Sequence, residues 1–178
     1  VTQMCYEIAS DPRNNATVIY HSIDDAARFI LFKLVANGAN HLGLKLGHIT
    51  NPNYWEAQKA LKDLKKIREQ GYKQIIDLVK NQRLVLKDAS ENNSLAYAEN
   101  LLRYYREILP DRNIVLAIDN FHKLPDYAQY NGQQRVKAIS KHGKGISTTY
   151  DCTVITNVEY EKMYDNAMQP QSDITHTT

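Results

Sequence analysis

The stretch IVLAIDNFHKL (residues 114–124) places five apolar residues directly before an acid, Asp119, and then turns polar. A short apolar run rich in β-branched residues is typical of a strand that is buried on both faces. Three other runs have the same character: TVIYH (17–21), LVLK (84–87) and TVITN (153–157). None of these runs alternates cleanly between apolar and polar residues, so they predict the strands of a mainly parallel sheet.

Helical patterns lie between these runs. Residues 24–37 form one pattern, and residues 54–70 form another, which we expect Gly71 to end. Residues 94–109 repeat apolar side chains at helical spacing behind Ser94, a residue type that favours the N-cap position. Strands that alternate with helices of this length indicate βαβ units. The predicted fold class is therefore α/β.

Length and composition describe an ordinary folded domain. The chain has 178 residues, of which 24% are charged and 43% hydrophobic, and a chain of this size buries roughly 70% of the surface that it exposes when unfolded. No apolar stretch approaches the roughly 20 residues of a membrane span, and VTQMCYEIAS (1–10) does not have the pattern of a secretory signal. We therefore expect a soluble, cytoplasmic protein without a membrane partner. The net charge of +2 does not by itself indicate nucleic-acid binding.

Cysteine and histidine spacing gives no indication of a zinc site. Cys5 and Cys152 lie far apart and match no zinc motif, so we expect two reduced thiols. The histidines form no H-x-x-x-H or H-E-x-x-H pair. Residues 166–178 are polar and patternless, which predicts a loop or a frayed end.

Acids follow two of the predicted strands. Asp24 comes shortly after the run 17–21, and Asp119 directly follows the run 114–118. In an open parallel sheet, ligands bind outside the carboxyl ends of the strands. An acid at this place can hold Mg²⁺ beside the phosphates of a nucleotide, but it can also cap the next turn. The pattern alone leaves both interpretations of Asp119 open.

Six segments, taken in order, resemble the ATPase domain of DnaB-family replicative helicases. VIYHSIDD is similar to the family's strand with a Ser-Leu-Glu-Met signature, GHITNPNYWEAQKAL to its Gly-Arg-Leu-Ser stretch, and LVLKDA to its next strand. IVLAIDNFHKL is similar to the Walker B segment, QQRVKAISKHGKGIS to the helix after it, and TYDCTVITNVEYEK to the last signature strand. The likeness covers most of residues 1–165, and it implies a RecA-like three-layer sandwich with a mainly parallel central sheet.

The resemblance implies cofactors, partners and roles. The cofactors would be ATP and Mg²⁺, and the partners single-stranded DNA, further copies in a hexameric ring, and a primase or helicase loader. Asp119 matches the Walker B acid, which orders Mg²⁺, usually through water. Asp24 falls where the family has a Glu that activates water, although it is shorter and could instead cap a helix. Glu159 falls where a Gln senses the γ-phosphate, or else at a solvated helix start.

One motif of such a site does not occur in the sequence. There is no G-x-x-x-x-G-K-[ST] loop to hold phosphates, so the nucleotide-binding residues stay unknown. Residues 1–10 resemble the helix that follows this loop in the family. We therefore expect residues 1–178 to be a RecA-like core that is truncated at both ends, after the phosphate loop and before the strand with the family's arginine finger.

The loop 122–135 is the candidate DNA contact. It combines Lys123 and Arg135 with Tyr127 and Tyr130. Cations pair with phosphates, and aromatic rings stack on the bases of single strands, although a polar loop with Pro and Gly can also be a plain connection. The lysines of the helical pattern 54–70 alternate with acids, which favours a solvated face.

The sequence therefore predicts the core of a DnaB-like helicase that couples ATP hydrolysis at subunit interfaces to translocation on single-stranded DNA. The alternative is a RecA-like regulatory or scaffold module that binds nucleotide without efficient hydrolysis. The alternative follows from Asp24 and Glu159, since both depart from the residue types of the family.

Overall fold

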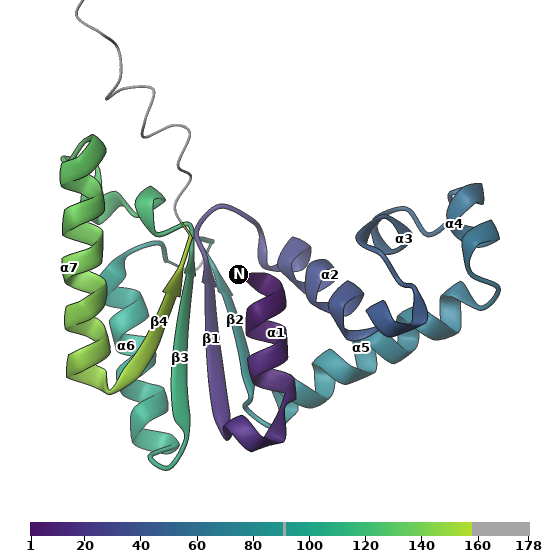
Figure 1. The fold of residues 1–178 in the computed structure, drawn as a ribbon, viewed down its shortest axis with the longest axis horizontal. Coiled ribbons are helices and arrows are strands. Elements are labelled where there is room, and N and C mark those ends of the chain that lie inside the picture. The colour runs from purple at the N-terminus through teal and green to yellow at the C-terminus, as the bar shows by residue number, and fades with distance from the viewer. Residues whose placement is uncertain (91, 158–178) are drawn as a thin grey trace, which may run out of the picture.

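The computed structural model describes residues 1–90 and 92–157. In these ranges one sheet is formed by β1 (Ala16–Ser22), β2 (Leu84–Asp88), β3 (Asn113–Asp119) and β4 (Cys152–Thr156). The strand order is β2-β1-β3-β4, and every pair is parallel (Figure 1). The predicted strands and the α/β class are confirmed, and each strand boundary lies within one residue of its prediction.

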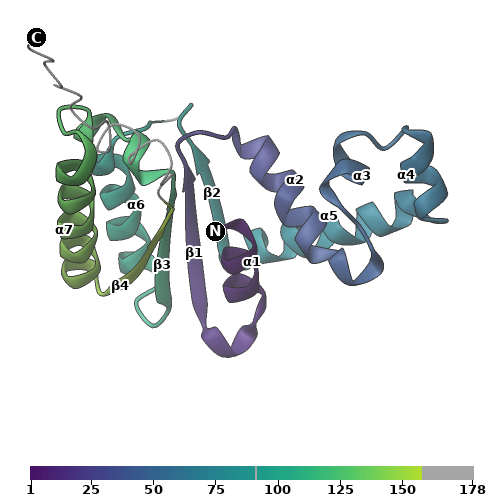
Figure 2. The ribbon, with the colours of Figure 1, turned by 45° about the horizontal axis from the view of Figure 1, so that its top comes forward.

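Helices cover both faces of this sheet. They are α1 (Thr2–Ser10), α2 (Ala27–Gly38), α3 (Leu46–Thr50), α4 (Trp55–Ala60), α5 (Leu64–Lys80), α6 (Leu95–Ile108) and α7 (Gly132–Tyr150). Residues of β1 alternate between two cores: Val18 and Tyr20 pack with residues of α1, α2 and α5, whereas Ile19 packs with residues of α6 and α7. The result is the predicted three-layer sandwich, which Figure 2 shows with the carboxyl ends of the strands turned forward.

The helical pattern 54–70 is two helices in the structure, and Gly71 does not end the second. α4 ends at Ala60, whereas α5 begins at Leu64 and continues through Gly71 to Lys80. A Cβ on residue 71 would lie 2.8 Å from the backbone oxygen of Val35 in α2. The prediction was wrong because this glycine lets α2 and α5 cross in contact, and does not mark a helix end.

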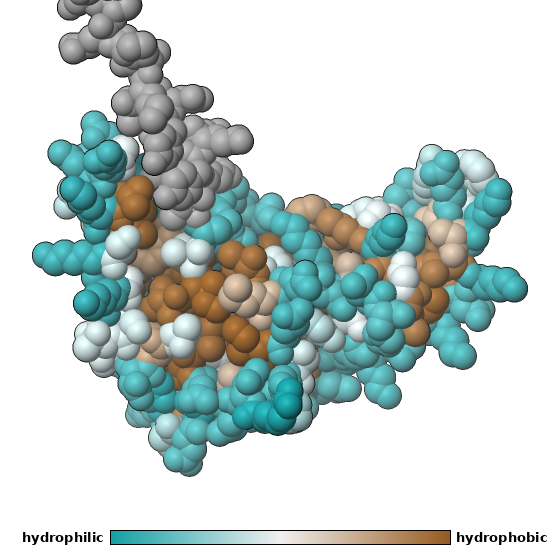
Figure 3. All heavy atoms as spheres, in the orientation of Figure 1, coloured by the Kyte–Doolittle hydropathy of each residue, from teal (hydrophilic) through white to brown (hydrophobic). Residues whose placement is uncertain are grey.

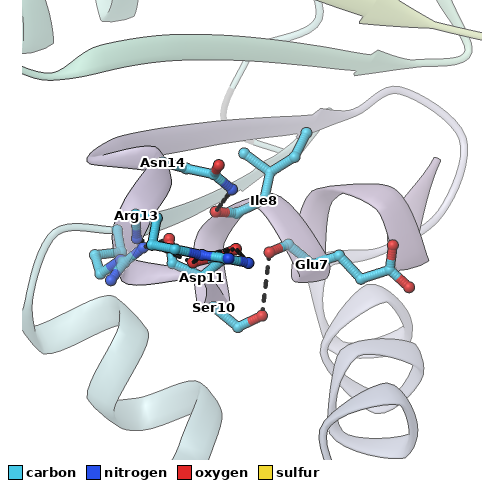
Figure 4. Close-up of polar contacts among 7 residues, drawn as sticks. Glu7, Ile8, Ser10, Asp11, Arg13 and Asn14 are labelled. Atoms are coloured by element: carbon cyan, nitrogen blue, oxygen red, sulfur yellow. Dashed lines mark hydrogen bonds and ion pairs between the residues drawn. The ribbon is translucent and has the colours of Figure 1, made fainter.

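A polar corner turns the chain from α1 into β1 (Figure 4). Asp11 accepts a hydrogen bond from the backbone N–H of Arg13 at 3.0 Å, and its carboxylate forms an ion pair of 2.7 Å with the Arg13 guanidinium. Asn14 donates to the backbone oxygen of Ile8 at 3.1 Å, which ties the turn to the helix. Asn15 has a left-handed backbone with φ of 42°. The chain therefore reverses, and α1 packs beside β1 with its first turn near the carboxyl end of that strand.

The helices α3 and α4, here called the arm, lie along the half of α5 that extends away from the sheet (Figures 1 and 2). Ile49 of α3 and Ala57 of α4 are buried in the same core cluster as Leu64 of α5. Trp55 at the start of α4 is 61% exposed. Figure 3 shows hydrophobic surface both over the sheet and on the arm. Across the described ranges, no helix is long and apolar enough to cross a lipid bilayer.

Candidate functional site

The site lies where the order of the strands reverses. From β1 the chain passes to β2 on one side, and from β3 it passes to β4 on the other, so the switch point lies between β1 and β3. In open α/β sheets this is the place where ligands bind. The parallel register aligns Ser22 of β1 with Asp88 of β2 and with Asp119 of β3. Asp119 therefore lies at the switch point, at the carboxyl edge of the sheet.

A buried tyrosine holds the carboxylate of Asp119. The hydroxyl of Tyr20 donates a hydrogen bond to Oδ2 of Asp119, and the same hydroxyl lies 3.1 Å from Oγ1 of Thr2 in α1. Tyr20 is fully buried. Burial, and then the hydrogen bond to Asp119, raise the pKa of Tyr20 well above its usual value, so its phenol stays a neutral donor. The peptide bond that follows Asp119 is cis.

Sequence reasoning missed Tyr20 and Thr2. Tyr20 lies in an apolar run and has the pattern of an ordinary core residue. The available signal was a single hydroxyl near the end of a strand that is otherwise apolar, because a buried tyrosine hydroxyl usually needs a partner.

Asp24 lies in the loop after β1 and meets two residues from the segment after β3. Its Oδ2 forms an ion pair of 2.5 Å with Nζ of Lys123, and Asn120 donates to the same oxygen at 3.4 Å. The Lys123 and Asp24 side chains are 33% and 48% exposed, so the ion pair lies at the surface. The structure thus brings Asp24 to the neighbour of Asp119 in the chain.

Asp24 does not cap α2, which begins later than predicted. The N-cap residue of α2 is Ala26, and the first-turn N–H of Ala27 donates to Oδ2 of Asp88 at 2.7 Å. The hydroxyl of Ser90, and then this N–H, hold the pKa of Asp88 below its usual value. The capping acid of this helix is therefore Asp88, from the neighbouring strand.

The loop 122–135 folds into two short 3-10 turns followed by the start of α7. Tyr127 is only 3% exposed, and its ring centroid lies 5.6 Å from that of Phe121. The prediction that Tyr127 stacks on DNA bases was therefore wrong, because its ring belongs to the core. Tyr130 is 39% exposed, and Arg135 lies in the first turn of α7.

Two of the four predicted DNA contacts, Tyr130 and Arg135, thus keep a partly exposed side chain, whereas Lys123 forms an ion pair with Asp24. Glu159, the predicted phosphate sensor, lies outside the described residues.

The donors at the switch point fit Mg²⁺ better than zinc. Within residues 1–90 and 92–157, no group of three or more His, Cys, Asp or Glu side chains could hold a metal ion. Mg²⁺ in nucleotide sites needs no such group, since it keeps several waters and takes one or two protein oxygens together with substrate phosphates. Asp119 and Thr2, joined through Tyr20, supply a carboxylate and a hydroxyl of this kind.

Comparison with known proteins gives the fold. No protein-family model matches the sequence, and no curated protein matches it either. Among solved structures, the chain is similar to the ATPase domain of a DnaB-like helicase, with 16% identity and a TM-score of 0.65 over 87% of this chain and 51% of that one. It is also similar to a second DnaB-like replicative helicase, described together with its interactions with primase. Here the identity is 17% and the TM-score 0.60, over 81% of this chain and 32% of that one.

The chain spans about half the length of the first of these proteins and about a third of the second. At these identities the similarity concerns the fold. The parallel sheet, the two helical layers and the switch point at Asp119 agree with it. The chain therefore has the RecA-like three-layer fold of DnaB-like ATPase domains.

Proposed function

We propose that the chain is the core of a DnaB-like, ATP-dependent DNA helicase. The observation that carries this proposal is the position of Asp119 at the β1–β3 switch point, where Tyr20 connects it to the first turn of α1. A helix N-terminus attracts phosphate through its free N–H groups and dipole, and a carboxylate beside it can order the metal of a nucleotide. Both features lie at one edge of the sheet.

In this proposal Asp119 orders Mg²⁺, with Thr2 as a second oxygen. Bound Mg²⁺ would neutralise the charge that develops on the β- and γ-phosphates. Asp24 would activate the attacking water, and its ion pair with Lys123 must open or shift before Oδ2 can accept a proton. Asn120 helps to hold Asp24 at the edge of the site. Glu159 as γ-phosphate sensor stays a prediction.

The partners are proposed at the same level. Tyr130 presents a partly exposed ring for base stacking, and Arg135 a guanidinium for phosphate, so both could contact a single DNA strand. Lys123 would reach a DNA phosphate only after leaving Asp24. We further propose a hexameric ring, a primase or helicase loader as partner, and a cytoplasmic location.

The decisive experiment measures ATP hydrolysis and nucleotide binding by the full-length protein, as Mg²⁺ and single-stranded DNA are varied. We expect Mg²⁺-dependent turnover that DNA stimulates. Asp24→Asn should lower turnover without weakening the binding of Mg-ADP, because a general base acts on water and not on the metal. A full-length protein that binds no Mg-nucleotide would contradict the proposal.

Residues 1–178 alone provide a second test. They contain no phosphate loop, and the N–H groups of that loop supply much of the affinity for a triphosphate. We expect this chain to show no measurable ATP turnover and at most weak nucleotide binding. Steady Mg²⁺-dependent phosphate release from the purified chain would refute this expectation.

The second candidate function is a regulatory or scaffold module that binds nucleotide without hydrolysing it efficiently. The ion pair between Asp24 and Lys123 favours it, because one oxygen of the proposed base is occupied. An Asp is also shorter than the Glu of the resembled family. Tight Mg-nucleotide binding without turnover, with and without DNA, would identify the module, whereas DNA-stimulated turnover would identify the helicase.

A further inference from the structure

We propose that Tyr20 is a positioning residue, which fixes the carboxylate of Asp119 for Mg²⁺ and links it to α1. This inference rests on the function proposed above and adds a residue to the same site. Its basis is one hydroxyl with two polar neighbours: it donates to Oδ2 of Asp119, and it lies 3.1 Å from Oγ1 of Thr2. Three elements, β1, β3 and α1, therefore meet at the phenol oxygen.

Packing alone does not require this hydroxyl. The ring of Tyr20 belongs to a core cluster whose buried members include Cys5, Val18 and Val115. A Phe side chain would fill the same space and would need no hydrogen-bond partner. A polar atom in a dry core is costly unless its partners satisfy it. The Tyr20 hydroxyl is thus explained by the partner it holds, namely Asp119.

Holding one oxygen of a carboxylate restricts its rotation. With Oδ2 engaged by Tyr20, the plane of the Asp119 carboxylate is set before any metal arrives. Groups that orient metal ligands in this way change metal affinity or activity by about 10- to 100-fold when they are mutated. The donated hydrogen bond also withdraws some charge from the carboxylate, which acts in the opposite direction. We expect orientation to dominate, because the phenol remains neutral and the site is buried.

The test compares Tyr20→Phe with a matched control in the full-length protein. Tyr6→Phe is the control, because the Tyr6 hydroxyl also donates to one side chain, Gln74 at 3.2 Å, but does so at the α1–α5 contact. Two readouts do not depend on turnover: Mg²⁺-dependent binding of a fluorescent ADP, and binding of Mn²⁺ followed by electron paramagnetic resonance.

We expect Tyr20→Phe to raise the Mg²⁺ concentration for half-maximal ADP binding by about tenfold. Affinity at saturating Mg²⁺ and the melting temperature should change little. Tyr6→Phe should leave the Mg²⁺ requirement unchanged. In an Asp119→Asn background, Tyr20→Phe should add no further shift, since the two residues act through one hydrogen bond. A purely structural role of Tyr20 would lower the melting temperature without this dependence on Asp119.

If Tyr20→Phe does not fold, Tyr20→Gln and Tyr20→Met provide the comparison. The two side chains are similar in size and differ in a donor group, so Gln should require less Mg²⁺ than Met. An unchanged Mg²⁺ requirement in Tyr20→Phe, or equal requirements in the Gln and Met variants, would overturn the role of Tyr20 and leave the proposed function standing. Absence of Mg²⁺-dependent ADP binding in the unmodified protein would instead reject the proposed function, and this inference with it.

Discussion

Asp119→Asn separates a metal-ordering acid from a simple turn residue. Asparagine keeps the size of the side chain and an oxygen that can accept the hydrogen bond of Tyr20, but it removes the charge. If Asp119 orders Mg²⁺, hydrolysis by the full-length protein should collapse while the fold survives. If Asp119 only shapes the turn after β3, hydrolysis should hardly change, because Asn is as good a turn and cap residue as Asp.

The structure sets the size of both effects. The Tyr20–Asp119 hydrogen bond changes from a charged to a neutral one, which costs about 1 kcal/mol and lowers the melting temperature of a domain of this size by about 2–4 °C. Loss of the charge that orders the metal removes several kcal/mol of stabilisation of the transition state. A loss of about 3 kcal/mol corresponds to roughly a hundredfold lower turnover. The two readouts should therefore separate clearly.

Asp88→Asn is the matched control. It makes the same chemical change at the same edge of the sheet, but its carboxylate caps α2. ATP turnover and melting temperature are measured on one preparation of each variant. We expect near-normal turnover in Asp88→Asn and a collapse in Asp119→Asn. Normal turnover in Asp119→Asn, or equal losses in both variants, would refute the metal assignment.

Three further predictions concern stability and reactivity. Gly71→Ala should destabilise the chain by about 1–3 kcal/mol in urea unfolding, because the new Cβ would meet the backbone oxygen of Val35; helix propensity alone predicts a gain of about 1 kcal/mol, so a gain would disprove the close crossing. Burial raises the pKa of Cys5 to about 12 and that of Cys152 to about 11, so both thiols should react slowly with a disulfide reagent at about pH 8 until the chain is unfolded; fast reaction of the folded chain would argue against their burial. The Ser90 hydroxyl holds the pKa of Asp88 below its usual value, so this carboxylate stabilises the fold above about pH 3.9 and the stabilisation is lost as the pH falls through the lower pKa of the folded state. Melting temperatures between about pH 5 and pH 2 should therefore fall less for Asp88→Asn than for the unmodified chain, and parallel curves would contradict this assignment.

Local sequence pattern was sufficient for the sheet and for the position of Asp119. Each strand is a short apolar run, and burial on both faces leaves little else that such a run can form. The parallel arrangement then places the residues after the runs at one edge, whatever the details of the helices. Ser94 also caps α6 as predicted, because its hydroxyl accepts a hydrogen bond from the N–H of Tyr97, three residues further along the chain.

Contacts between distant residues could not be predicted in this way. Tyr20 and Asp119 are 99 positions apart, and neither residue type indicates the other. Tyr127 lies in a segment whose composition is that of an exposed loop, yet two short turns bury its ring against Phe121. Gly71 has the local character of a helix end, but its role depends on Val35 in another helix. In each case tertiary packing decided the outcome.

The crossing of α2 and α5 at Gly71 also has a mechanical consequence. Side chains change rotamer within nanoseconds, but a helix backbone in contact with another backbone has no rotamer to change. The separation of the two helix axes is therefore fixed here by van der Waals contact at residue 71. α2 begins three residues after Asp24, and the arm packs on α5. A displacement at the carboxyl edge of the sheet is thus transmitted through a stiff joint, and the arm moves as the long end of a lever.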